Sequence, residues 1–325
     1  MAVRCVSGSR RGARSDRRPR YPREAVAARW LDLIDPTSDE VLAVLPVHVD
    51  PEVVEALAAP PGKGREPRPV IEGHGAYVFG VLMAARPVPE EDRVAYHEID
   101  FVASPSLLVT VRKTSTDGIP YDPAGLHPAA AQGAPVGELV SRLVDDVADS
   151  YLGFLDAAYI EIEELEDEMD TWPASQVRSR ISDLRHELLH GRRTVAATRA
   201  AVRRVLDGRI EVGDHALFPP AVERLFAETY ETLVRVAEEL DIARDLLAGV
   251  RDYHQSKVVE GQGDVARKLT VIASLVLVPS LIVGFFGQNF EGEFTKGFWT
   301  LGASTGLIVV STLVQLALFR WRRWI

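Results

Sequence analysis

The chain has 325 residues, a formal net charge of −10 at pH 7 and a single cysteine, Cys5. This length allows one or two domains with a full hydrophobic core, and one cysteine excludes an internal disulfide, which suits a reducing compartment. The acidic balance argues against nucleic acid as the main partner, because phosphate binding needs a basic face.

Residues 1–29 form an arginine-rich arm that differs from the rest of the chain. The arm holds nine arginines and two acidic residues, a net charge of +7, so the remaining residues carry −17. It lacks the apolar stretch of a secretory signal, and its Arg, Ser and Pro content predicts disorder. We expect a solvated tail, with contact to anionic lipid head groups as the alternative.

Residues 30–135 are expected to form a small α/β domain. Small polar residues followed by acids at residues 36–40 predict a helix start. Apolar and alternating runs predict strands at residues 28–34, 69–72, 76–83 and 97–112, the last of which turns at Ser104-Pro105-Ser106. Loops are expected at residues 60–69 and 120–135, and Gly62-Lys63-Gly64 lacks the spacing of a phosphate-binding loop.

Residues 136–220 are expected to be helical. Apolar residues at helical spacing predict helices over residues 136–170 and 175–205, and Pro219-Pro220 ends the pattern. The first helix ends in the acidic run IEIEELEDEMD, residues 160–170. Such a run is usually a solvated helix face, and electrostatic binding of cations is the alternative.

The second of these helices carries His186-Glu187-Leu188-Leu189-His190, which fits the H-E-x-x-H pattern of zinc proteases, with Glu211 as a candidate third ligand. Arg185, Arg192 and Arg193 flank the motif and disfavour a nearby dication. The helical pattern also continues without a break after it. We therefore expect a surface helix here, and no metalloprotease activity.

Residues 221–268 predict a stalk helix that leads into an uncharged apolar run. A helical pattern of this length without proline is typical of a stalk or a coiled coil. Residues 269–289 and 298–319 predict two membrane spans, because each contains at least eighteen successive uncharged residues, enough to cross a hydrocarbon core of about 30 Å. The alternative is a pair of buried helices in a soluble protein.

The charges that flank the two spans predict their orientation. Arg267 and Lys268 precede the first span, and the tail of residues 320–325 holds three arginines and two tryptophans. Basic residues collect on the cytoplasmic side of a membrane, and tryptophan collects at its interface. We therefore expect a multi-pass protein of the cell membrane, with both termini in the cytoplasm and the loop of residues 290–297 outside.

The first span and its flanks resemble the CorA magnesium-transporter family. The matching features are the start Arg267-Lys268-Leu269-Thr270, the Pro279-Ser280 step and Gly287-Gln288-Asn289 at the outer end. The strand-like runs and the acidic helix also fit, so the resemblance covers residues 30–325. It implies a homopentameric, funnel-shaped channel built from an α/β cytoplasmic domain, a long stalk helix and a two-helix transmembrane hairpin.

Two positions depart from the family pattern. Gln288 stands where the G-M-N signature has methionine, and Gly263 stands where the family has a pore-facing asparagine. The resemblance implies transport of divalent cations, with Mg²⁺ first and Co²⁺ and Ni²⁺ as further ions. It implies no enzymatic activity and no cofactor besides transported or regulatory Mg²⁺. The alternatives are Zn²⁺ transport, as in the zinc branch of the family, and a non-conducting membrane scaffold or sensor.

Residues along the first span predict one face of a pore. Steps of seven back from Gly287 reach residues that are small, polar or acidic apart from one valine, and a heptad stripe keeps one helix face toward a symmetric axis. This stripe consists of Ser280, Ala273, Ala266, Val259 and Asp252. Leu269 and Leu277 lie beside it and are candidates for a hydrophobic constriction.

The outer end of the first span offers oxygen ligands to a hydrated ion. Gly287 would present backbone carbonyls and Gln288 and Asn289 would present side-chain amides, while Glu291 and Glu293 in the loop would attract cations. The resemblance also implies a regulatory metal site between cytoplasmic domains. Its candidate residues are Glu228 and Glu231 of one subunit and Glu90, Glu91 and Asp92 of a neighbour, although Val88 stands at the aligned position of the second set.

Overall fold

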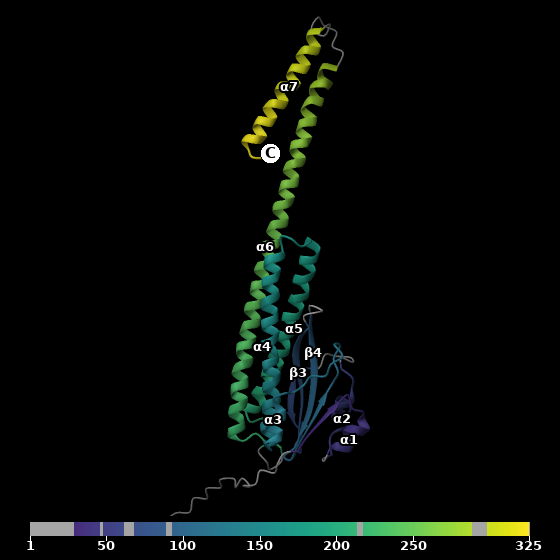
Figure 1. The fold of residues 1–325 in the computed structure, drawn as a ribbon, viewed down its shortest axis with the longest axis vertical. Coiled ribbons are helices and arrows are strands. Elements are labelled where there is room, and N and C mark those ends of the chain that lie inside the picture. The colour runs from purple at the N-terminus through teal and green to yellow at the C-terminus, as the bar shows by residue number, and fades with distance from the viewer. Residues whose placement is uncertain are drawn as a thin grey trace, which may run out of the picture. The chain divides into compact units, whose positions relative to one another are not determined.

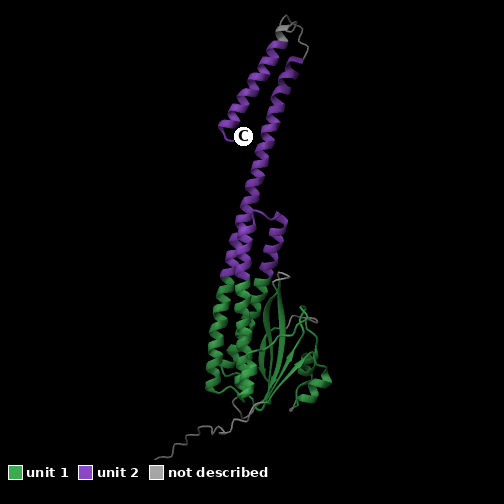
Figure 2. Cartoon of the chain, in the orientation of Figure 1, with its two compact units in different colours: residues 1–157, 187–241 green, residues 158–186, 242–325 purple. Residues whose placement is uncertain are grey.

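The computed structural model describes residues 29–45, 48–61, 68–88, 93–212, 217–287 and 298–324, and its side chains in the last range begin at residue 301. The chain divides into two compact units, residues 1–157 with 187–241 and residues 158–186 with 242–325 (Figure 2). Three long helices contribute to both units: α4 (Val136–Glu168), α5 (Ala174–Leu206) and α6 (Pro220–Gly287). The arginine-rich arm lies outside the described residues, except for Arg29.

The first unit contains a five-stranded sheet with the order β1-β5-β4-β3-β2. The strands are β1 (Arg29–Ile34), β2 (Val70–Gly73), β3 (Val78–Val88), β4 (Arg93–Ala103) and β5 (Leu107–Arg112). β1 pairs parallel with β5, and the other pairs are antiparallel. The predicted strands are therefore confirmed, and the sequence Ser104-Pro105-Ser106 turns the chain between β4 and β5, where Ser104 N donates to Leu107 O at 2.9 Å.

Helices cover both faces of this sheet (Figure 1). On one face, α1 (Ser38–Val44) and α2 (Pro51–Ala58) pack their buried valines and Leu57 against one cluster of sheet residues, Phe79 and Val81 of β3, Val102 of β4 and Val111 of β5. On the other face, the Tyr151 hydroxyl of α4 donates to the backbone oxygen of Met83 at 2.6 Å. Because both faces are covered, β3, β4 and β5 bury most of their residues, which explains the apolar runs in β3 and β5.

Different local features favour the short helices α1 and α3. The predicted helix start at residues 36–40 is confirmed, because Thr37 and Glu40 form a reciprocal capping box at the start of α1. The expectation of a loop throughout residues 120–135 is wrong, since α3 (Leu126–Ala131) lies within it. Leu126 is fully buried, and this contact together with three successive alanines favours a helix over the propensity of the flanking Pro and Gly.

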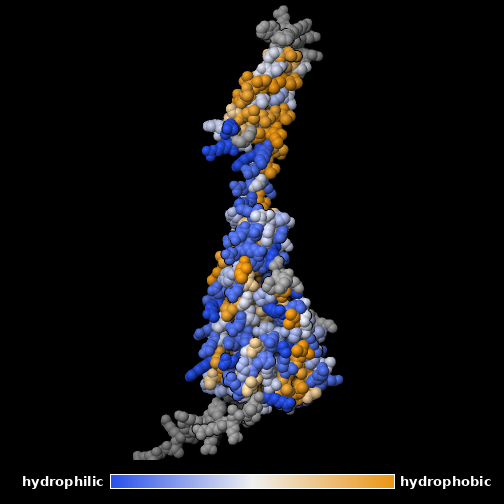
Figure 3. Space-filling model, in the orientation of Figure 1, coloured by the Kyte–Doolittle hydropathy of each residue, from blue (hydrophilic) through white to orange (hydrophobic). Residues whose placement is uncertain are grey.

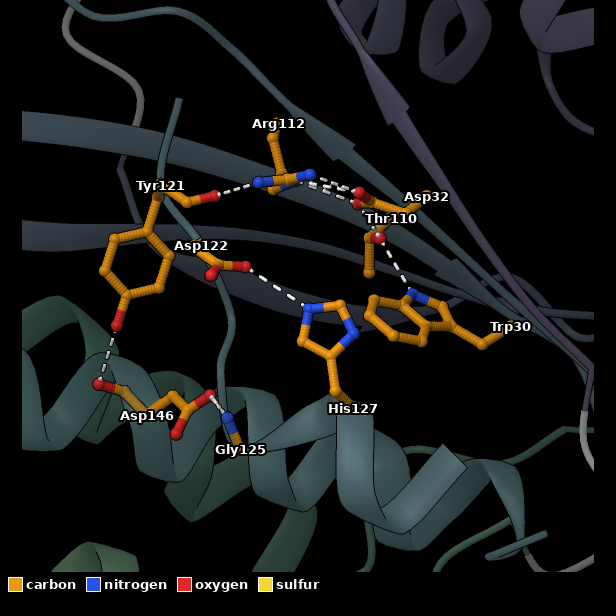
Figure 4. A network of polar contacts seen from close by, with 9 residues as sticks. All are labelled: Trp30, Asp32, Thr110, Arg112, Tyr121, Asp122, Gly125, His127 and Asp146. Atoms are coloured by element: carbon orange, nitrogen blue, oxygen red, sulfur yellow. Dashed lines mark hydrogen bonds and ion pairs between the residues drawn. The ribbon is translucent and has the colours of Figure 1, made fainter. Parts of the chain in front are cut away.

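A polar network ties the β1–β5 edge of the sheet to α4 (Figure 4). The Arg112 guanidinium donates to the Asp32 carboxylate and, at 2.6 Å, to the backbone oxygen of Tyr121. The Tyr121 hydroxyl donates to Asp146 O at 3.1 Å, and the Asp146 carboxylate accepts from Gly125 N at 2.8 Å. Burial raises the pKa of Asp146, while the hydrogen bond from Gly125 opposes that rise. The network therefore fixes the connection between β5 and α4.

The second unit is helical in its described residues. It comprises the end of α4, the start of α5, the rest of α6 and α7 (Phe298–Trp321). Ion pairs join α5 to α4, from Arg180 to Glu161 at 2.8 Å, and α6 to the turn after α4, from Lys257 to Asp170 at 3.1 Å. The predicted stalk and the first predicted span form one uninterrupted helix of 68 residues, with Pro279 inside it.

Candidate pore and membrane interface

Two helices among the described residues are long and apolar enough to cross a membrane. One is the C-terminal part of α6, and the other spans Leu301–Trp321 of α7. Within these apolar segments the only buried hydrophobic side chains that the structure describes are Val271 and Phe319. Apolar residues accordingly dominate the surface where α6 and α7 form the hairpin (Figure 3). A surface of this extent is typical of contact with lipid or with other subunits.

The heptad stripe of α6 lies on exposed helix surface along its whole length. Every stripe residue is exposed in the single chain: Asp252, Val259, Ala266, Ala273, Ser280 and Gly287. Leu269 and Leu277 beside the stripe are 65% and 69% exposed. The stripe therefore makes no packed contact with the described parts of its own chain, and it is available to face other copies of α6.

The inner end of the stripe is polar, but its acid has a partner that the sequence reading missed. The Asp252 carboxylate accepts from two nitrogens of the neighbouring Arg251 guanidinium, at 2.9 and 3.2 Å. Asp252 also lines a shallow hollow on α6, together with Gln255, Ser256, Val259 and Glu260. Carboxylate, amide and hydroxyl oxygens, which suit a hard cation, thus gather on one face of the helix.

Hydroxyl groups inside the apolar part of α6 bond to the helix itself. Ser280 Oγ donates to Val276 O at 2.7 Å, and Thr270 Oγ1 donates to Ala266 O at 2.8 Å. Pro279 lacks the N–H that would bond to Leu275 O, yet the helix continues to Gly287. Polar groups satisfied in this way fit a helix in lipid, where no water is available to bond them.

Several predicted site residues lie outside the described residues, namely Gln288, Asn289, Glu291 and Glu293 at the outer end and Glu90, Glu91 and Asp92 in the candidate regulatory site. Glu228 and Glu231 are exposed on α6 within the first unit. In the described ranges, no group of three or more His, Cys, Asp or Glu side chains is arranged to hold a metal ion. Both sets therefore remain predictions.

The H-E-x-x-H side chains bond to neighbouring structure instead of converging. Glu187 Oε1 accepts from the backbone N–H of Val94 at 3.2 Å. The His190 ring packs on Tyr96 with ring centroids 4.0 Å apart, and His186 Nδ1 lies 2.6 Å from Ser182 O. Glu187 and His190 are partly buried, so this face of α5 is an interface with β4, whereas the sequence predicted a surface helix.

A buried cluster of charged residues, Lys113, Glu98 and Asp100, was not predicted from the sequence. Lys113 Nζ donates to the Glu98 carboxylate and, at 2.9 Å, to the backbone oxygen of Ala56 in α2, and it forms an ion pair with Asp100 Oδ2 at 2.8 Å. Lys113, Glu98 and Asp100 are 3%, 7% and 0% exposed. Burial raises the pKa of Asp100 to about 7, although the Lys113 charge opposes the rise. The only signal in the sequence is a pair of acids inside the apolar strand β4.

The similarity to known proteins extends over the sheet, the long helix α6 and the apolar hairpin. A family model described as "CorA-like Mg2+ transporter protein" matches residues 27–322. The cobalt/magnesium transport protein CorA of Methanocaldococcus jannaschii is 24% identical over 311 residues, which cover 91% of each chain. The protein of the same description from Thermotoga maritima is 24% identical over 193 residues, 58% of this chain and 52% of the relative, so this match spans about half of the relative's length.

Solved structures show the same fold. The complete structure of the CorA magnesium transporter from M. jannaschii superposes with a TM-score of 0.72 at 19% identity, covering 91% of both chains. The cytoplasmic domain of ZntB from Vibrio parahaemolyticus superposes with a TM-score of 0.53 at 14% identity, covering 71% of this chain and 88% of that one. The fold is therefore shared by proteins whose names differ.

Proposed function

Because the chain belongs to the CorA-like Mg²⁺ transporter family, we propose that it transports divalent cations, Mg²⁺ first, across the cell membrane through a central pore lined by α6. The observation that carries this proposal is the exposed stripe of mostly small and polar residues on α6, a helix that continues into a largely exposed apolar span. A single chain leaves this stripe without a partner, whereas a ring of copies would enclose it.

The proposed assembly is a homopentamer, the state implied by the resemblance to the family. Small stripe residues such as Ala266 and Ala273 would allow the α6 helices to approach closely around the axis. The positive charges of Arg267, Lys268, Arg320, Arg322 and Arg323 support an orientation in which both termini lie in the cytoplasm. The remaining faces of α6, and α7, would then contact lipid.

The proposed conduction pathway begins at the outer ends of the α6 helices. Mg²⁺ sheds its water reluctantly, so amides of Asn289 and Gln288 and carbonyls of Gly287 would contact first-shell water. Neutral ligands hold the ion weakly enough to release it. Leu277 and Leu269 would form apolar constrictions that close by excluding water, and Asp252 would meet the ion at the inner end.

A second candidate ion is Zn²⁺. The fold match to the ZntB domain and the replacement of the signature methionine by Gln288 favour this alternative. Softer ligands such as imidazole and thiolate suit Zn²⁺, whereas oxygen ligands suit Mg²⁺. The stripe holds neither histidine nor cysteine, which places Mg²⁺ first in our proposal.

The test is ion flux in liposomes that contain the purified full-length protein. Mg²⁺ and Zn²⁺ entry would be followed with internal dyes for the wild type, for Asn289→Ala and for Gln176→Ala, a control that removes an amide from an exposed position of α5. A second pair of variants tests the stripe. Ala273→Leu places a leucine on the stripe, and its control, Ile272→Leu, places a leucine at the neighbouring position.

We expect Mg²⁺ entry in the wild type and both controls, and at least about a tenfold loss in Asn289→Ala and Ala273→Leu, because both changes act on the pore axis. Entry of Zn²⁺ alone would select the second candidate. An assembled oligomer that passes neither ion would overturn transport and favour the scaffold. Loss of flux in Ile272→Leu equal to that in Ala273→Leu would show that the stripe does not line the pore.

The regulatory metal site is a separate proposal, in which internal Mg²⁺ bridges Glu228 and Glu231 of one subunit to Glu90, Glu91 and Asp92 of the next. Bound cations would offset the repulsion between these carboxylates and favour a closed pore. Inhibition of flux by internal Mg²⁺ should therefore weaken in Glu228→Ala, and unchanged inhibition would remove Glu228 from this site.

A further inference from the structure

We propose that the inner ends of the two apolar helices form a binding surface for anionic phospholipid head groups. The surface, here named the basic collar, consists of Arg267, Lys268, Arg320, Arg322 and Arg323. This inference rests on the proposed insertion of α6 and α7 into a membrane. It adds a partner, a lipid of negative charge, that the transport proposal does not require.

Most of the positive charge of the collar has no ion-pair partner among the described residues. Arg267 pairs with Asp264 at 3.1 Å. Lys268 and the three arginines of the tail make no ion pair with any described residue, in a chain whose net charge is −10. These four cations are therefore available to attract an anion from outside the described chain.

The C-terminal tail folds back at the end of α7. Arg323 adopts a φ of +56°, a left-handed conformation that non-glycine residues rarely adopt. Trp324 N–H then donates to Phe319 O at 2.9 Å, and the Trp324 ring stacks on Phe319 with centroids 5.9 Å apart. The turn therefore keeps Arg322 and Arg323 at the end of the apolar helix, and it does so at a position where glycine would be free of strain.

The chemistry of the collar suits a lipid phosphate. Guanidinium groups present paired N–H donors that match phosphate oxygens, and they do so better than the point charge of lysine. Trp321 is 79% exposed beside them, and indole rings prefer the level of the lipid head groups. Phosphate, arginine and tryptophan would thus meet at one level, where the apolar segments end. A phosphatidylglycerol head group fits this arrangement, since it adds negative charge without a competing amine.

The positive-inside distribution explains why basic residues lie on this side of the membrane, but it does not require their neutralisation by a particular lipid. The two explanations differ in a measurable way. Orientation depends on the total of basic residues near the spans, so Arg267 and Lys268 should preserve it when the tail is changed. Preference for anionic lipid depends on each collar residue, at about fivefold in affinity apiece near an anionic surface.

The experiment measures which phospholipids the full-length protein retains. Wild type, the triple variant Arg320→Gln/Arg322→Gln/Arg323→Gln and a control triple are incorporated into vesicles with equal phosphatidylglycerol and phosphatidylcholine, extracted in detergent, and analysed for bound lipid. The control triple removes the same charge from exposed positions of α5, at Arg185, Arg193 and Arg203. Labelling of Cys5 from either side of the vesicle checks the orientation of each variant.

We expect the wild type and the control triple to retain phosphatidylglycerol in preference to phosphatidylcholine, and the tail triple to lose that preference by at least about fivefold. Should the tail triple fail to assemble, Arg323→Gly serves instead, because glycine keeps the left-handed turn and removes one charge. It should lower the preference by about two- to fivefold.

Equal lipid preference in the tail variants and the wild type would overturn the inference. So would stabilisation of the detergent-solubilised wild type by inorganic phosphate to the same degree as by phosphatidylglycerol, since the collar would then bind free phosphate. A wild type that retains phosphatidylglycerol but passes no cation in any vesicle would leave the lipid surface standing and remove the proposed transport.

Discussion

The sheet of the first unit and the apolar hairpin of the second place side chains in opposite environments. In the sheet, Lys113 and Asp100 are buried and pair with each other inside one chain. In the hairpin, Leu277 and Leu281 are 69% and 71% exposed. The first unit thus buries its core within one chain, whereas the hairpin leaves an exposed apolar surface, which our proposal assigns to lipid and further copies of the chain. Substitutions that look alike should therefore have different effects in the two regions.

The largest effect is expected from a charge placed on the apolar face of α6. Leu281→Arg puts a guanidinium into the proposed hydrocarbon region, about 100° around the helix from Ser280 and the stripe. Arginine at the centre of a span costs about 2.5–3.5 kcal/mol in each copy. We expect almost no assembled oligomer in detergent extracts of membranes, as measured by size-exclusion chromatography.

The matched control for this change is Leu42→Arg in α1. Leu42 is 56% exposed, comparable to Leu281, but it belongs to the first unit, where water is the expected surrounding. Its substitution should stay within about 0.5 kcal/mol of wild-type stability. Normal assembly of Leu281→Arg would mean that this face of α6 contacts water, which would contradict the membrane reading of the hairpin.

The next effect concerns the buried cluster of Lys113, Glu98 and Asp100. Lys113→Met removes the ammonium but leaves both carboxylates buried, and breaking a buried pair in this way costs about 3–5 kcal/mol. We expect a large fall in the thermal unfolding temperature and rapid hydrogen exchange in β4 and β5. The double variant Lys113→Met/Asp100→Asn should recover part of the loss, because it buries one charge fewer. Stability equal to that of the wild type in Lys113→Met would show that the cluster is open to water.

A smaller effect follows from the pKa of Asp100, which burial raises to about 7 from its ordinary value of 3.8. Between those values the folded protein holds a proton that the unfolded chain has released. Stability from this group is therefore full below about pH 4 and is lost as the pH rises to 7, at about 1.4 kcal/mol per pH unit.

Asp100→Asn removes this titration and should flatten the pH dependence of unfolding. The measurement is the difference in unfolding temperature between wild type and Asp100→Asn at pH 5 and pH 8, for the full-length protein in detergent. We expect the variant to gain stability relative to the wild type as the pH rises. A constant difference across this range would place the ionisation of Asp100 outside it.

The strands and the long helices were predictable because their signals are local, whereas α2 and α3 were not predicted. Apolar periodicity predicted α4 and α5, the small polar and acidic residues at 36–40 predicted the start of α1, and uncharged length predicted the spans. Long-range contacts were not predictable: Lys113 meets Ala56, and Glu187 meets Val94, 93 residues away in sequence. The proposed pore is harder still to predict from the sequence, because the proposed partners of the stripe are other copies of the same helix.

The smallest effect is expected at the H-E-x-x-H motif, where the sequence pattern and the geometry disagree. In a metalloprotease Glu187 would be a general base, and Glu187→Gln would abolish the chemistry. Here Glu187 accepts a hydrogen bond from Val94 N, and glutamine keeps an oxygen that accepts the same bond. We therefore expect Glu187→Gln to match the wild type in cation flux and in zinc content, and to match its stability within about 0.5 kcal/mol. Glu187→Ala removes the acceptor and should lose about 1 kcal/mol, detected as a lower unfolding temperature. Proteolytic activity of the wild type that Glu187→Gln abolishes would contradict this interpretation and would support a metalloprotease site at the motif.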